Sequence, residues 1–231
     1  MQSFWDERAR EDAAYFVDNL LDYRNGDMEE FWARGEEVVD KLLGEFGLTV
    51  GPDDQVVEIG CGIGRLTRVL AARAGHVWAL DISAEMLDRA REAVGELPNV
   101  DWLHGDGTTL RPVEDGAATA CFSFVVFQHV PDPAITLGYV REMARVLRPG
   151  GWSAFQISND PSIHRPHKLS VGDRLKRILG RAPKGQSHPA WLGSAVDLGE
   201  LERTASQAGL VVERVDNPGT QFCMVLLRKP A

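Results

Sequence analysis

The chain has 231 residues, of which 44% are hydrophobic and 26% charged, which predicts one large globular domain or a domain with a substantial insertion. It contains no run of roughly 18 apolar residues and no signal-peptide pattern at its N-terminus, so we expect a cytoplasmic protein without a membrane span. The formal net charge of −9 argues against the phosphate attraction on which nucleic-acid binders depend.

The charge is unevenly distributed along the chain. Residues 1–50 hold 13 acids against 5 Lys and Arg, whereas residues 158–196 hold 7 Lys and Arg against 2 acids. The basic segment carries enough positive charge to attract a carboxylate or phosphate, although a solvated amphipathic helix at 174–181 would also explain much of it. The three cysteines, Cys61, Cys121 and Cys223, are far apart and lack metal-ligand spacing, so we expect reduced, packed thiols and no metal site.

The predicted elements begin with helices and continue as an alternating pattern. Apolar residues recur at helical spacing in 7–23 and 38–46, so the first 47 residues read as helical. Apolar strand-like runs then occupy 55–59, 76–80, 100–103, 118–124 and 152–157, with helical patterns that begin at 65, 84 and 133 between them. Such alternation is typical of parallel strands joined by crossover helices.

The last third of the chain departs from this alternation. A turn-rich stretch covers 158–196, a helix is predicted at 197–208, and strands at 210–215 and 221–227 are close enough to pair in antiparallel fashion. The predicted fold is therefore an α/β, Rossmann-like doubly wound and mostly parallel sheet of about seven strands. Its last strand is antiparallel, helices precede the sheet, and a cap insertion precedes the last helix.

The most informative motif is the glycine-rich turn that follows the first predicted strand. It contains Gly60, Gly62 and Gly64, and such glycines let the backbone approach a ligand closely. By itself the turn is also compatible with a dinucleotide-dependent oxidoreductase. Two features disfavour that reading: Arg65 stands where dinucleotide binders have Gly or Ala, and Glu58 would suit a cationic ligand better than a pyrophosphate.

These residues resemble the class I S-adenosylmethionine-dependent methyltransferases, in which an acid and an apolar residue precede a Gly-x-Gly-x-Gly turn. The resemblance extends over 55–157 as an ordered series of motifs. It implies an enzyme with S-adenosyl-L-methionine as cofactor and S-adenosyl-L-homocysteine as product. The residues it implies for the first part of the cofactor site are Glu58, Gly60, Cys61, Gly62 and Gly64.

Two further motifs extend the cofactor site. Asp81 ends the second strand 21 residues after Gly60, a spacing at which a carboxylate can accept both ribose hydroxyls. By resemblance, Ile82 and Met86 form the wall against the adenine ring. Asp106 would accept a hydrogen bond from the adenine amino group and Gly107 would bind a ring nitrogen; a plain turn is the alternative reading of this segment.

The segment after the fourth strand is expected to face the transferring methyl group. It presents Phe124, Gln128 and His129 where ligands bind in open parallel sheets, beyond the carboxyl ends of the strands. His129 is the candidate general base because imidazole titrates near neutral pH, with Gln128 as the second candidate. A histidine that only shapes the pocket is the competing interpretation, and Phe124 is expected to contact the cofactor.

The substrate is expected to be a small molecule that meets the variable parts of the chain, and the basic segment favours an anionic one. The candidate substrate residues are Tyr23, Trp32, His129, His164 and Arg165. We expect a single domain with a helical cap at 1–50, a cofactor core at 51–157, a substrate cap at 158–196 and a C-terminal helix and strand pair at 197–231. Acceptor atom and oligomeric state stay open.

Two other functions are compatible with the same motifs. A protein that binds S-adenosylmethionine without catalysing a reaction would keep the whole motif series. A nucleic-acid methyltransferase is disfavoured by the net charge and by the absence of a Pro-Pro-aromatic signature, although the basic segment is compatible with it.

Overall fold

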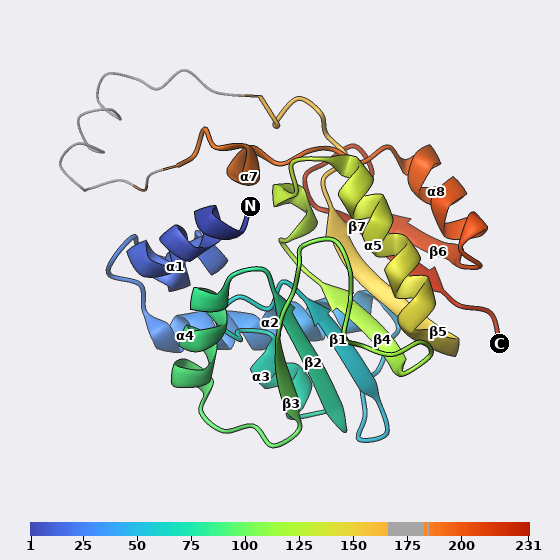
Figure 1. Ribbon diagram of the computed structural model, residues 1–231, viewed down its shortest axis with the longest axis horizontal. Coiled ribbons are helices and arrows are strands. Elements are labelled where there is room, and N and C mark those ends of the chain that lie inside the picture. The colour runs from blue at the N-terminus through green and yellow to red at the C-terminus, as the bar shows by residue number, and fades with distance from the viewer. Residues whose placement is uncertain (166–182, 184) are drawn as a thin grey trace.

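The computed structural model describes residues 1–165, 183 and 185–231. Its centre is a seven-stranded sheet with the strand order β3-β2-β1-β4-β5-β7-β6 (Figure 1). Parallel pairing joins neighbours from β3 to β5, and β7 runs antiparallel to both β5 and β6. The predicted mostly parallel sheet with an antiparallel strand near its end is therefore confirmed. The strands are β1 (Gln55–Ile59), β2 (His76–Asp81), β3 (Val100–His104), β4 (Ala118–Ser123), β5 (Leu147–Ile157), β6 (Val211–Asp216) and β7 (Cys223–Arg228).

Helices cover both faces of this sheet. The first face packs against α2 (Met28–Phe46), α3 (Thr67–Ala71) and α4 (Ala84–Val94) through one apolar cluster. The opposite face packs against α5 (Pro133–Val146) and α8 (Leu198–Gln207) through a second. The central strands read as continuous apolar runs because both of their faces are buried.

The helix starts follow the capping chemistry of the sequence. Ser83 accepts a hydrogen bond from the Met86 N–H at the start of α4, and Asp132 accepts one from the Ala134 N–H before α5. Such caps satisfy backbone donors that the first helical turn leaves unpaired. The predicted helix starts at Ala84 and Pro133 are confirmed.

Two predicted boundaries differ from the structure. The first helix, α1 (Gln2–Val17), ends earlier than expected, with Asp12 in a non-helical conformation at a kink. The fifth strand was expected at 152–157, whereas β5 begins at Leu147 and its pairing with β4 shifts register between Ala118, which pairs with Leu147, and Ala120, which pairs with Trp152. Periodicity did not indicate the kink at Asp12.

A third apolar cluster places α1 over the carboxyl ends of the parallel strands, beside α7 (Pro189–Leu192) (Figure 1). The Asp6 carboxylate accepts hydrogen bonds from the Ser83 hydroxyl at 2.6 Å and from the Glu85 N–H at 3.4 Å. The N-terminal helix is thereby bonded to the start of α4. None of the helices described here is both long and apolar enough to cross a bilayer.

Candidate functional site

The glycine turn after β1 is folded against the end of β2. The N–H groups of Gly60 and Cys61 both donate to the carbonyl oxygen of Leu80, at 2.7 and 3.0 Å. Gly60 and Gly62 have φ angles of +75° and +54°, a backbone region that favours glycine. A side chain at Gly60 would also collide with Val126, so both backbone conformation and space require glycine here.

Asp81 lies at the carboxyl end of β2 and lines the same pocket. One carboxylate oxygen accepts a hydrogen bond from the Gly62 N–H and the other accepts one from the Ser83 N–H, both at 2.8 Å. Burial raises the pKa of Asp81, while these backbone hydrogen bonds act in the opposite direction. A carboxylate accepts about four hydrogen bonds, so Asp81 retains lone pairs for ligand hydroxyls.

Glu58 and Arg65 flank the glycine turn. The Glu58 side chain is buried, accepts a hydrogen bond from the Thr67 hydroxyl at 2.6 Å, and lines the pocket. Burial raises its pKa to about 7, against the effect of the Thr67 hydrogen bond. Arg65 forms a buried ion pair with Asp18 at 2.7 Å. Its positive charge is therefore balanced by Asp18 and not by Glu58 or Asp81.

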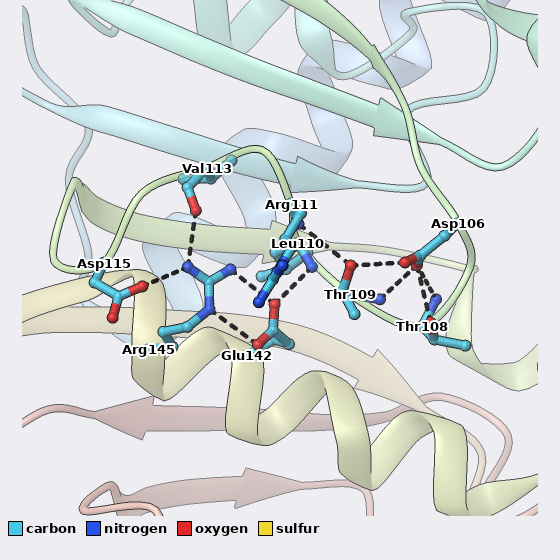
Figure 2. Close-up of polar contacts among 9 residues, drawn as sticks. All are labelled: Asp106, Thr108, Thr109, Leu110, Arg111, Val113, Asp115, Glu142 and Arg145. Carbon is cyan, nitrogen blue, oxygen red and sulfur yellow. Dashed lines mark hydrogen bonds and ion pairs between the residues drawn. The ribbon is translucent and has the colours of Figure 1, made fainter.

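The loop after β3 contributes Gly105 and Gly107 to the pocket, whereas Asp106 is directed elsewhere. Its carboxylate accepts hydrogen bonds from the backbone and hydroxyl groups of Thr108 and Thr109, at 2.7 to 3.0 Å (Figure 2). Slight burial raises the pKa of Asp106, but these hydrogen bonds outweigh it and hold the pKa at about 2. Asp106 is not among the described pocket residues, and its adenine contact stays a prediction.

The same loop is fastened to α5 (Figure 2). The Glu142 carboxylate accepts a hydrogen bond from the Leu110 N–H at 2.9 Å. Arg145 donates to the Val113 carbonyl at 2.8 Å and pairs with Asp115 at 2.7 Å and with Glu142 at 2.7 Å. These contacts fix the path of the chain directly after the glycines that line the pocket.

The chain turns sharply after β4. Phe124, Val125 and Val126 all line the pocket, and Val125 has a φ of +59°, which is a strained value for a β-branched residue. The Val125 N–H donates to the Gln156 side-chain oxygen at 3.1 Å. Strain of this kind persists where the surrounding structure holds it, and it is common at functional sites.

Gln128 and His129 follow on the short 3-10 helix η1 (Phe127–His129). His129 lines the pocket, whereas Gln128 is buried and points away from it, toward Gln156. The His129 Nδ1 lies 2.9 Å from the Trp191 carbonyl oxygen, and its Nε2 lies 3.1 Å from the Gln128 side-chain nitrogen. Burial lowers the pKa of His129 to about 4.

Aromatic side chains from two distant segments, α1 and α7, surround His129. The Trp5 ring meets the His129 ring edge-on at 5.4 Å between centroids, and Trp191 lies 5.2 Å from His129. Phe16 packs edge-on against Trp191 at 5.7 Å. Trp5, Phe16 and His129 line the pocket, and with Trp191 we call them the aromatic wall.

Four residues that were expected to contact substrate lie away from the described pocket lining. Tyr23 donates its hydroxyl to Glu11, and Trp32 lies under the Arg68 guanidinium. His164 bonds to Ser158 and to the Leu192 carbonyl, and Arg165 is exposed. The other basic residues of the predicted cap, His167, Lys168, Arg174, Lys176 and Arg177, are outside the described residues.

Sequence reasoning missed Trp5, Trp191 and Gln156. The sequence did contain a signal for Gln156, because it is a polar residue near the end of an otherwise apolar strand. In the structure it is fully buried, and a buried amide needs hydrogen-bond partners. Trp5 and Trp191 carried no comparable signal, since their meeting depends on how α1 and α7 pack over the sheet.

The site fits S-adenosylmethionine on chemical grounds. The described charged side chains of the pocket lining are Glu58, Asp81 and Arg65, and Arg65 is already paired with Asp18. Two acids without a free cation suit a ligand that carries a sulfonium, an ammonium and ribose hydroxyls, and they would repel a pyrophosphate. Glu58, Asp81, Ile82, Met86 and Gly107, all expected at this site, lie together in it.

Comparisons with known proteins agree with this chemistry. A family model described as a methyltransferase domain matches residues 57–155. The chain is 35% identical over 148 residues to an uncharacterised 37.1 kDa transposon protein of Streptomyces fradiae, a match over 58% of this chain and 42% of that protein. It is 33% identical to the trans-aconitate 2-methyltransferase of an Azoarcus species, over 71% of this chain and 67% of that protein.

Solved structures show the same fold. The N-methyltransferase NodS of Bradyrhizobium japonicum, in complex with S-adenosyl-L-homocysteine, matches with a TM-score of 0.62 at 15% identity, over all of this chain and 98% of that one. The fold and the pocket thus define a class I methyltransferase. The chain belongs to the S-adenosylmethionine-dependent methyltransferases, and S-adenosyl-L-methionine is its cofactor.

Proposed function

We propose that this enzyme transfers the methyl group of S-adenosylmethionine to a small, anionic metabolite or natural-product intermediate. The observation that carries the proposal is the aromatic wall, which closes the pocket beyond the strand ends with Trp5, Phe16, His129 and Trp191. An apolar pocket with few polar groups suits a small molecule. The net charge of −9 disfavours a polynucleotide substrate.

Different residues bind the cofactor and the acceptor, at two ends of the pocket. Asp81 holds the ribose end, and Glu58 lies where a cationic group of the ligand is favoured. The bound cofactor supplies a methyl group that is already activated, so catalysis depends largely on position and orientation. The aromatic wall excludes water and holds the acceptor against the glycine turn and Val126. Phe124 completes the wall on the side of β4.

Two observations support an anionic substrate. Residues 158–196 carry an excess of five positive charges, and this segment includes α7, which contributes Trp191 to the wall. The relative from Azoarcus is named for methylation of trans-aconitate. In this proposal residues 1–50 and 158–196 form a cap over the cofactor core at 51–157.

The first experiment measures methyl transfer directly. Purified protein is incubated with S-adenosylmethionine labelled in its methyl group and either a low-molecular-mass metabolite extract, total RNA or genomic DNA. Label in the small-molecule fraction supports the proposal. Label in nucleic acid refutes it, and adenosyl binding without any transfer would indicate a non-catalytic binding protein.

The anionic part has a separate test. Charge reversal of Arg165, Lys168 and Arg174 to Glu is expected to weaken apparent substrate affinity at least tenfold, with the cofactor affinity unchanged. Arg203→Glu, an exposed position on α8, is the matched control. Unchanged substrate affinity in the triple variant would refute the anionic assignment.

A further inference from the structure

A buried chain of hydrogen bonds links β5 to the aromatic wall. Gln156 is fully buried in β5, and its side-chain nitrogen lies 3.1 Å from the side-chain oxygen of Gln128. The Gln128 nitrogen lies 3.1 Å from the His129 Nε2, and the His129 Nδ1 lies 2.9 Å from the Trp191 carbonyl. We call Gln156, Gln128 and His129 the amide relay.

The first backbone contact fixes the direction of every link in the relay. The Val125 N–H can only donate, so the Gln156 oxygen accepts and the Gln156 nitrogen faces acceptors. That nitrogen accordingly contacts the carbonyls of Ile157 and Gln221 as well as the Gln128 oxygen. The Gln128 nitrogen must then donate to the His129 Nε2, which uses the lone pair of that ring nitrogen.

The second backbone contact requires the same arrangement. The Trp191 carbonyl can only accept, so the His129 Nδ1 carries the proton. A protonated imidazole would place an N–H at Nε2 against the N–H group of Gln128, with both groups donating. Burial and the nearby His164 also disfavour the charged ring. His129 is therefore held neutral, with both ring nitrogens already bonded to the protein.

Other titratable side chains of the described pocket lining do not replace it. Arg65 is a cation already paired with Asp18, and Glu58 and Asp81 line the cofactor end, where the proposed function assigns them to the cofactor. Burial raises the pKa of the Cys61 thiol and of the Tyr139 phenol, so both keep their protons at neutral pH. The described wall thus offers an acceptor group no side chain to which it could lose a proton.

We infer that Gln128 and Gln156 are positioning residues that keep His129 neutral, and that the enzyme methylates small carboxylic acids on a carboxylate oxygen. This inference rests on the proposed function. Carboxylic acids are ionised at neutral pH, whereas phenols and alkylammonium groups still carry the proton that blocks attack. A carboxylate lone pair forms the new oxygen–carbon bond as the sulfur–carbon bond breaks and its electron pair stays on sulfur. The product is a neutral methyl ester and a neutral thioether, and no proton is transferred.

The acceptor class is tested with methyl-labelled S-adenosylmethionine and a low-molecular-mass metabolite extract. Mild alkali releases methanol from methyl esters and leaves methyl ethers, methylamines and C-methyl groups intact. Most of the label in volatile methanol supports the inference. Most of the label in alkali-stable small molecules overturns the carboxylate assignment and leaves the proposed function standing. No labelled small molecule at all removes the proposed function and the inference with it.

The relay is tested without any turnover, by nitrogen NMR of the His129 ring with bound S-adenosylhomocysteine. The expected spectrum shows a proton on Nδ1 and none on Nε2 from pH 6 to pH 8. Gln128→Glu replaces the donating amide by a carboxylate, so the ring is expected to gain a proton at Nε2 near neutral pH. Methyl transfer is expected to fall at least tenfold, because the added positive charge lies beside the sulfonium.

Gln207→Glu on the exposed side of α8 is the matched control and leaves both readouts unchanged. A Gln128→Leu variant removes the amide without adding a charge. We expect His129 to remain neutral in this variant, with the lone pair of its Nε2 no longer hydrogen-bonded to Gln128. A wild-type ring that carries its proton on Nε2, or that gains a second proton between pH 6 and 8, overturns the relay.

Discussion

The two ends of the pocket are built in different ways. The cofactor end is made of turns that directly follow β1, β2 and β3, and neighbouring turns hydrogen-bond to one another through Gly60, Gly62 and Asp81. The acceptor end is made of rings from α1, η1 and α7, which are far apart in the chain. Strand ends fix the first end through backbone geometry, whereas helix packing fixes the second, so substrate choice can change while cofactor binding is kept.

The strongest perturbation is expected where the two ends are joined. Arg65 follows the glycine turn, Asp18 follows α1, and both partners of their ion pair are buried. Arg65→Met leaves the Asp18 charge buried with Arg34 at 3.6 Å, so we expect a loss of about 3 kcal/mol in the free energy of unfolding. Urea denaturation measures it. Arg91→Met, which breaks an exposed pair with Asp88, is the control, with a change below about 0.5 kcal/mol. A loss below about 1 kcal/mol for Arg65→Met would show that the ends are not coupled here.

Asp81→Ala tests the cofactor end alone. The carboxylate bonds two backbone N–H groups and is expected to accept ribose hydroxyls, and hydrogen bonds to a charged group contribute about 1.5–3 kcal/mol each. The dissociation constant of S-adenosylhomocysteine is therefore expected to rise roughly 100-fold. Calorimetric titration gives this value, with the exposed Asp88→Ala as the control. A change below about fivefold would place the ribose elsewhere.

Glu58 makes cofactor binding depend on pH. Its pKa of about 7 means that raising the pH from 6 to 8 ionises it, which favours a cationic ligand, so affinity for S-adenosylmethionine is expected to rise about tenfold. Glu58→Gln removes this component, and the difference between the two proteins cancels the titration of the ligand itself. Identical pH profiles for both proteins would contradict the prediction.

The same group affects stability in the opposite direction. Because the folded pKa of Glu58 is raised above the ordinary value of 4.5, its protonated form favours the folded state. That contribution is complete below about pH 4.5 and is lost as the pH rises to about 7. The free energy of unfolding is measured between pH 4.5 and pH 7 for the wild type and for Glu58→Gln. The wild type is expected to lose more stability than the variant as the pH rises.

The smallest effect is expected at the fastening of the loop after β3. Glu142→Ala removes the acceptor for the Leu110 N–H and a partner of Arg145, which costs about 1 kcal/mol of loop stability. Cofactor affinity is expected to fall about fivefold by calorimetry, with the exposed Glu202→Ala on α8 as the control. Equal affinities in both variants would show that the loop holds its shape without α5.

The cofactor end was largely predictable from the sequence because it depends on short-range order. Neighbouring residues reveal the three features on which it depends: glycines that need positive φ angles, an acid at the end of β2, and the alternation of strands and helices. Glu58, Asp81, Ile82 and Met86 accordingly lie where the motif series places them. Asp106 differs in that Thr108 and Thr109 hydrogen-bond to its carboxylate, and its adenine contact stays a prediction.

The acceptor end was not predictable for the opposite reason. Tyr23 and Trp32 were selected as aromatic residues of the N-terminal helices, yet the kink at Asp12 and the packing of α1 present Trp5 and Phe16 instead. His129 lines the pocket, but its hydrogen-bond state depends on Gln156, a residue 27 positions later.

The contact between Asp6 and Ser83 affects how the protein folds. The first turn of α4 depends on a carboxylate that lies 77 positions earlier in the chain. Long-range contacts of this kind form late, since the entropy of closing the intervening segment must first be overcome. The N-terminal helix is consequently not an arm that folds by itself: shortening the chain past Asp6 would loosen α4, and the turn that carries Asp81 would loosen with it.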